Sequence, residues 1–121
     1  MLVGVSLIGM IADGLRFKVV ASPKVGLSGQ TLTMKVTVPR AKENRQIAFA
    51  VECSSGFYQS WQEQIFGERG PGVFDWRREK MAPGWCELSA MVAYLDPTAK
   101  QGVGYRSAHD TACFAGMDVQ C

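Results

Sequence analysis

Apolar and polar residues alternate with a period of two along most of the chain. Residues 31–38 and 46–53 show the alternation most clearly. The apolar positions of these two segments are Leu32, Met34, Val36, Val38, Ile47, Phe49, Val51 and Cys53. Successive side chains of a β-strand point to opposite faces of a sheet, so this period predicts strands with one buried and one solvated face.

Five further segments have strand character and are separated by turn residues rich in glycine and proline. They are residues 15–20, 57–66, 73–76, 85–95 and 105–114. Segment 57–66 also places apolar residues four positions apart, as a short helix would, but the neighbouring strands favour a strand. About seven short strands joined by turns predict an all-β antiparallel sandwich.

The amino-terminal segment, residues 1–12, is apolar and uncharged. It is too short to cross a bilayer as a helix, which needs about 20 such residues, so no membrane span is expected. Its β-branched residues favour a strand, with Val3, Val5 and Leu7 on one face. We therefore divide the chain into an arm, residues 1–12, and one sandwich domain, residues 13–121. The arm either completes its own sheet or pairs with that of a neighbouring molecule.

The net charge argues against a nucleic-acid partner. Lys and Arg number 13 and Asp and Glu number 11, and the two signs are mixed along the sequence. Binding to nucleic acid requires clustered basic residues that displace counterions from phosphates. The nearest approach to a basic cluster is the pair Arg77 and Arg78, which is flanked by the acidic residues Asp75 and Glu79.

Four cysteines indicate an oxidising compartment. Cys53, Cys86, Cys113 and Cys121 form no C-x-x-C pair, which argues against a zinc ribbon and a thioredoxin-like centre. Two disulfides are the expectation for so small a domain, and they predict a secreted, periplasmic or cell-surface location. Reduced, buried cysteines in a cytosolic protein are the alternative. The sequence leaves all three disulfide connectivities open.

No residue set points to catalysis. His109 is the only histidine, and Cys113 follows four positions later. On one strand these two residues would stand about 13 Å apart, too far for a hydrogen bond. A blue-copper site needs two histidines, and no Walker loop or G-x-S-x-G motif is present. The sequence therefore predicts no enzyme, no metal and no cofactor.

Large aromatic residues are concentrated between residues 57 and 85. They are Phe57, Tyr58, Trp61, Phe66, Phe74, Trp76 and Trp85. Core packing accounts for most such rings, but an exposed ring offers a large rigid surface at low entropic cost. Trp61, Trp76 and Trp85 are therefore candidate ligand-binding aromatics.

The order of these signals resembles a fibronectin type III or bacterial immunoglobulin-like domain over residues 15–114. The resemblance rests on segments 32–39 and 47–53 and on the Pro83-Gly84 corner, followed by an alternating strand. Cys86 stands where that family often has a tyrosine, and no cysteine lies on the second strand. An alternative register takes Cys53 as the end of strand B and Trp61 as the tryptophan of strand C.

The topology of the resembled family also implies a disulfide pairing. Its third and sixth strands are antiparallel neighbours, which places Cys53 beside Cys86 and leaves Cys113 to pair with Cys121.

The functional hypothesis is a non-enzymatic structural or interaction domain outside the cytoplasm, whose partner is another protein or a second copy that accepts residues 1–12 as a strand. A carbohydrate-binding module is the alternative hypothesis.

Overall fold

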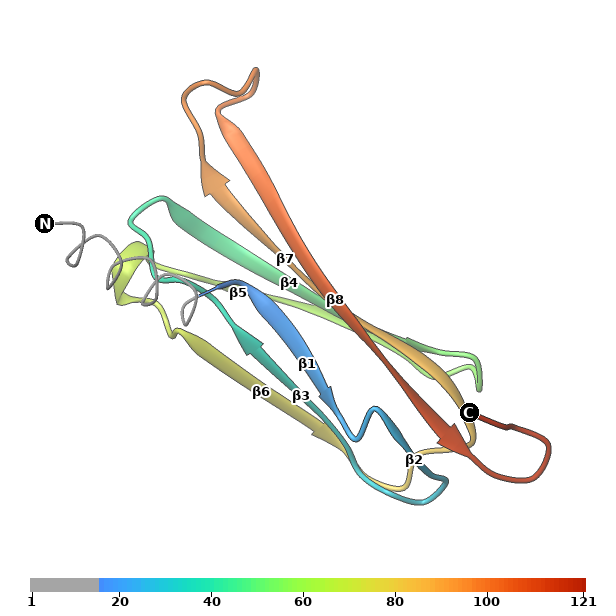
Figure 1. Cartoon of the computed structure of the whole chain (residues 1–121). Coiled ribbons are helices and arrows are strands. Elements are labelled where there is room, and N and C mark those ends of the chain that lie inside the picture. The colour runs from blue at the N-terminus through green and yellow to red at the C-terminus, as the bar shows by residue number, and fades with distance from the viewer. Residues whose placement is uncertain (1–15) are drawn as a thin grey trace, which may run out of the picture.

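The computed structural model describes residues 16–121, which form two facing β-sheets (Figure 1). The elements are β1 (Lys18–Ser22), β2 (Val25–Leu27), β3 (Leu32–Thr37), β4 (Asn44–Cys53), β5 (Tyr58–Gln64), the 3-10 helix η1 (Gly67–Arg69), β6 (Val73–Arg78), β7 (Gly84–Leu95) and β8 (Val103–Ala115). The predicted all-β class is confirmed for this part of the chain, and no helix within it is long and apolar enough to cross a membrane. The predicted arm, with Val3, Val5 and Leu7, lies outside the described residues.

One sheet has three strands in the order β1-β3-β6, and the other has five in the order β2-β8-β7-β4-β5. Every neighbouring pair is antiparallel except β2 and β8, which are parallel. Strands β7 and β8 form a long hairpin that extends past the other strands at one end (Figure 1). Apart from the parallel β2, which the sequence did not predict, the strands follow the predicted antiparallel pattern.

The core fills the space between the sheets, and it is built from the alternation seen in the sequence. On β3 the apolar positions Leu32, Met34 and Val36 are buried, whereas Thr33 and Lys35 are exposed. Strand β4 and strand β7 continue the pattern from the opposite sheet. The largest fully buried side chains of this core are Phe114, Leu32, Met34, Ile47, Leu88, Val36, Val51 and Cys86. Each large apolar side chain buried in this way contributes about 1.5–3 kcal/mol.

One lateral side of the sandwich is closed by the chain itself. Strand β1 belongs to the three-stranded sheet, but after a turn at Pro23 the chain joins the five-stranded sheet as β2. Asp110 on β8 fastens this crossing, because its Oδ2 accepts hydrogen bonds from the Ala21 amide (2.8 Å) and the Lys24 ammonium. The crossing therefore ties the first strands of the chain to the last.

At the opposite lateral side no strand of residues 16–121 crosses between the sheets, and aromatic rings fill the space instead. Strands β5 and β6 are edge strands of different sheets. Trp61 of β5 stacks on Phe49 at 4.9 Å between ring centroids and faces Trp76 of β6 at 6.0 Å. Phe57 lies 6.3 Å from Trp76, and the Arg78 guanidinium lies 3.9 Å from the Phe57 centroid. These rings, here called the aromatic ladder, join the two sheets by stacking and cation–π contact.

The assignment of faces on β7 predicts unequal effects for adjacent substitutions. Leu88→Ala removes a fully buried side chain and leaves a cavity, so it should lower the free energy of unfolding by about 2–5 kcal/mol. Glu87→Ala, one position away on the exposed face, should change it by less than about 0.5 kcal/mol. Chemical denaturation measures both, and equal losses would show that the strand does not present these faces.

Asp110 makes the stability depend on pH. Partial burial raises the pKa of Asp110, but the hydrogen bonds from Ala21, Lys24 and Thr111 together outweigh burial and hold the pKa below its ordinary value. A carboxyl group whose pKa is lower in the folded state stabilises the fold above its unfolded pKa of about 3.9, and that contribution is lost as the pH falls through the folded pKa.

Asp110→Asn should therefore lower the melting temperature at pH 7 and flatten its decline between about pH 5 and pH 2. Asp118→Asn, at an exposed carboxylate, is the matched control and should leave the profile unchanged. Thermal melts across this range measure the effect. A variant whose profile runs parallel to that of the unmodified protein would refute the role of Asp110.

Candidate functional site

A hollow lies at the end of the sandwich where the loop before β4, the end of β5 and η1 meet. The Ile65 amide donates a hydrogen bond to the Arg45 carbonyl (2.9 Å), which holds the end of β5 against the start of β4. The chain then turns at Gly67, which has a φ of 62° and passes close to the loop. A Cβ at position 67 would lie 3.2 Å from the Lys42 carbonyl oxygen, so both conformation and space favour glycine.

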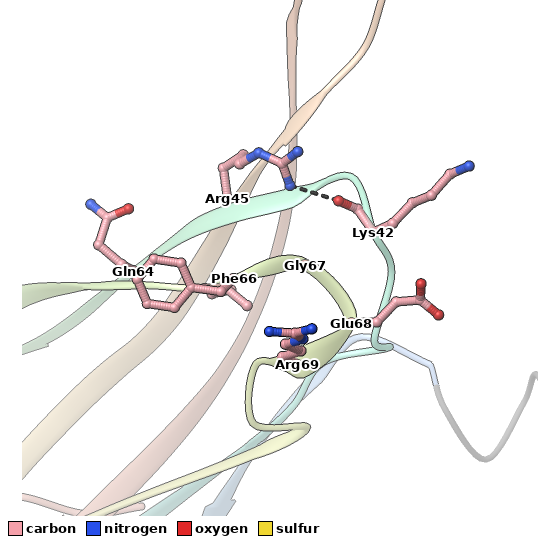
Figure 2. Close-up of a pocket in the computed structure, with 8 residues that line it drawn as sticks. Lys42, Arg45, Gln64, Phe66, Gly67, Glu68 and Arg69 are labelled. Carbon is pink, nitrogen blue, oxygen red and sulfur yellow. Dashed lines mark hydrogen bonds between the residues drawn. The ribbon is translucent and has the colours of Figure 1, made fainter.

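The hollow, here called the basic hollow, has a volume of about 480 Å³. This is within the range of small-molecule sites. Its lining residues are Lys42, Arg45, Gln64, Ile65, Phe66, Gly67, Glu68 and Arg69 (Figure 2). Among these residues three are cationic and one is anionic, so the hollow carries a net positive charge.

Two arginines dominate the hollow. Arg45 donates from Nη1 to the carbonyl oxygens of Lys42 (2.6 Å) and Asn44 (2.7 Å). These bonds fix the orientation of the guanidinium group and use only one of its three nitrogens. Figure 2 shows the side chains of Arg45 and Arg69 on opposite sides of the turn at Gly67, whereas those of Lys42 and Glu68 extend away. Each guanidinium group can therefore offer hydrogen bonds to an anion on its own side of the turn.

Phe66 adds a large apolar surface to the site. Its side chain is 74% exposed, the highest value among the exposed aromatic residues of the described chain. Arginines bind carboxylate and phosphate groups through paired hydrogen bonds, and an aromatic ring packs against planar groups. The arrangement can hold an anion that carries a planar apolar group. Its lining residues include neither a histidine nor a cysteine.

The structure does not bring the three candidate tryptophans together. Trp61 and Trp76 are half-buried in the aromatic ladder, where Phe49 and Trp76 lie against Trp61. Trp85 is 51% exposed on the outer face of the five-stranded sheet. Trp61 and Trp76 therefore connect the sheets and do not form a platform with Trp85.

All four cysteines form disulfides, Cys53–Cys86 and Cys113–Cys121. This is the pairing that the fibronectin-like topology implied. It follows here from the antiparallel pairing of β4 and β7, in which Cys53 lies directly opposite Cys86. His109 is exposed on β8. Because Cys113 is in a disulfide, the two residues form no nucleophilic pair.

The basic hollow was not predicted from the sequence, in which residues 42–45 and 67–72 are two separate turns. The β4–β5 hairpin brings them together, because Gln46 pairs with Gln64 at the same end of the two strands. The only signal in the sequence was that each of the two turns contains basic residues, such as Arg45 and Arg69. That these residues line one hollow follows from the register of the β4–β5 pairing, which the sequence does not show.

No family model matches this sequence, and no curated protein matches it. Solved structures do match. Two structures of superoxide reductase (neelaredoxin) from Ignicoccus hospitalis, one of them a variant, superpose with TM-scores of 0.54 and 0.52. They share 12% and 10% sequence identity with this chain, and each match covers 87% of this chain and 86% of the other. At this identity the likeness shows the fold alone.

The comparison corrects the family assignment. The resemblance to fibronectin type III and immunoglobulin-like domains was wrong, because the matching folds are superoxide reductases. The segments that carried it, 32–39, 47–53 and the Pro83-Gly84 corner, show only alternation and a turn, which any antiparallel sandwich needs. The parallel pairing of β2 with β8 gave no such signal in the sequence.

The functional hypotheses built on that family are corrected as well. The matching proteins are redox enzymes, which contradicts the prediction of a non-enzymatic structural or self-assembling module. It also contradicts the carbohydrate-binding alternative and the prediction that the chain is not an enzyme. Those inferences rested on an assumed family and on a search for motifs, and neither reports on a site that the fold assembles from separate turns.

The residues that the structure describes, 16–121, do not fit a redox metal. One-electron chemistry of oxygen species is carried out in proteins by metals or organic cofactors, and redox metals favour imidazole and thiolate ligands. The whole sequence has one histidine, and its four cysteines are joined in disulfides. No group of three or more His, Cys, Asp or Glu side chains within residues 16–121 could hold a metal ion. The described part of the chain thus has a sandwich fold similar to that of the superoxide reductase (neelaredoxin) structures, but its residues do not form a redox-metal site.

Proposed function

We propose that this protein binds a small organic anion, in which a carboxylate or phosphate is attached to a planar apolar group, in the basic hollow. The observation that carries the proposal is that Arg45 and Arg69 both line the hollow, together with the exposed ring of Phe66. Guanidinium groups bind the anion, and the phenyl ring supports the planar group.

The pre-ordering of Arg45 favours binding. Its bonds to the Lys42 and Asn44 carbonyls already restrict its rotamers, so less conformational entropy is lost when an anion arrives. A charge-assisted hydrogen bond contributes about 1.5–3 kcal/mol. Two such contacts and a partly covered ring, set against the cost of association, correspond to dissociation constants on the order of micromolar to millimolar.

The same proposal includes a location outside the cytoplasm. Two disulfides support it, since disulfides form and persist in oxidising compartments. A small organic anion at such a site would come from the surrounding medium.

Titration calorimetry with phenyl phosphate tests the proposal. Arg45→Gln and Arg69→Gln should each weaken binding about tenfold, which equals about 1.4 kcal/mol, and the double variant should abolish it. Arg77→Gln, the same change at an exposed arginine of β6, is the matched control and should bind normally. Phe66→Ala should weaken binding of phenyl phosphate but not that of inorganic phosphate.

Two results would contradict the proposal. Binding of phenyl phosphate that is unchanged in both arginine variants would place the ligand elsewhere. Equal heats from benzyltrimethylammonium, which has the ring but the opposite charge, would show that the hollow does not select anions.

A further inference from the structure

Cys113 is completely buried, yet it does not belong to the core. Ala112, Cys113 and Phe114 follow one another on β8, and all three are 0% exposed. Neighbouring residues of a strand face opposite sides of a sheet. Ala112 and Phe114 face the core cluster. Cys113 lies opposite Trp85 on the outer face of the five-stranded sheet. Something on that outer face must therefore cover the sulfur of Cys113.

Trp85 and Val25 flank Cys113 on this face, and the segment that follows β8, residues 116–121, here called the disulfide loop, brings Cys121 onto its sulfur. Its chain turns back after β8 (Figure 1), and Cys121 at its end is bonded to Cys113. No residue of the loop is buried, and Met117 is 95% exposed. Its backbone hydrogen bonds join Gly116 to Val119 within the loop itself. Gly116 packs closely against Ser28 and Pro83 at the start of the loop, and the disulfide joins the far end of the loop to β8.

The other disulfide is placed quite differently. Cys53 and Cys86 lie opposite each other on β4 and β7, both are buried, and both belong to the core cluster. A thiol can reach their sulfur atoms only after the sheet has opened. Cys121, in contrast, is exposed in the folded protein. The two disulfides should therefore react with thiols at very different rates.

We propose that Cys113–Cys121 is a thiol-exchange site at which a small dithiol releases the disulfide loop and uncovers Cys113 beside Trp85. A thiolate of the dithiol attacks Sγ of Cys121, the S–S bond breaks, and Cys113 leaves as a thiolate that takes up a proton. The second thiol of the dithiol then attacks the mixed disulfide and releases Cys121 as a thiol. The dithiol becomes a cyclic disulfide, and its two electrons and two protons are transferred to the cysteines.

Reduction changes the outer face of the sheet without changing its strands. Cys113 stays within β8, where its amide donates to the Lys24 carbonyl (2.9 Å), and its strand pairs with β7 on one side and β2 on the other. The thiol is therefore presented from a rigid strand next to the half-exposed indole of Trp85. This site is independent of the basic hollow, which lies at the end of β5.

Alkylation of the native protein tests the proposal. The protein is treated with dithiothreitol, quenched with iodoacetamide at intervals, and digested for mass spectrometry. Cys113 and Cys121 should be labelled on the order of a hundredfold or more faster than Cys53 and Cys86, because only the latter require opening of the core. The far-ultraviolet circular dichroism spectrum should stay unchanged while the tryptophan fluorescence shifts, and Trp85→Phe should remove that shift.

Two double variants, each lacking one of the disulfides, serve as controls. Cys113→Ser with Cys121→Ser should fold, take up no label under native conditions and show no fluorescence shift. Cys53→Ala with Cys86→Ala should keep the rapid labelling; should it not fold, the first variant and the unmodified protein still decide the question. Labelling of all four cysteines at one common rate would overturn the proposal. So would loss of the β-sheet spectrum when only Cys113 and Cys121 have reacted.

Discussion

The alternation of side chains along β4 is the constraint on which the rest of the structure depends. This strand pairs with β5 on one edge and β7 on the other, so its register fixes the centre of the five-stranded sheet. Its inward residues Ile47, Phe49 and Val51 form the middle of the core. A shift of one residue would turn them to solvent and separate Cys53 from Cys86. The start of the strand, at Arg45, also forms one wall of the basic hollow.

The core of the sandwich is closed in a different way at each of its two lateral sides. On one side the chain crosses between the sheets, and Asp110 fastens the crossing. On the other side edge strands β5 and β6 would leave the core open, and the aromatic ladder fills the gap. The high aromatic content of residues 57–76 therefore has a structural reason. This explains why Trp61 and Trp76, two of the three candidate ligand-binding aromatics, are half-buried.

The sequence predicted the strands well because strand formation here depends on local alternation, as at Leu32, Met34 and Val36. It did not predict β2, because a strand of only three residues is too short to show a periodic pattern. Its parallel pairing also depends on β8, which is distant in the sequence. The family was misassigned because alternation and a Pro-Gly corner are shared by many sandwiches. The basic hollow depends on the register of the β4–β5 pairing, which places the turns that carry Arg45 and Arg69 at the same end of the sandwich. Neither turn alone predicts that register.

This protein has a fold similar to that of known redox enzymes, but its candidate site is of a different kind. Its sandwich is similar to that of superoxide reductase (neelaredoxin), whereas residues 16–121 do not fit a redox metal. Two turns instead form a hollow that is lined by three basic residues and one acidic residue. Sites of this kind are placed on a fold and are not implied by it.

Nuclear Overhauser effects between the ring protons of phenyl phosphate and those of Phe66 would test this account most directly. We expect such contacts together with shifts of the Arg45 and Arg69 side-chain signals. Contacts to Trp85, with the signals of Phe66 unchanged, would contradict it.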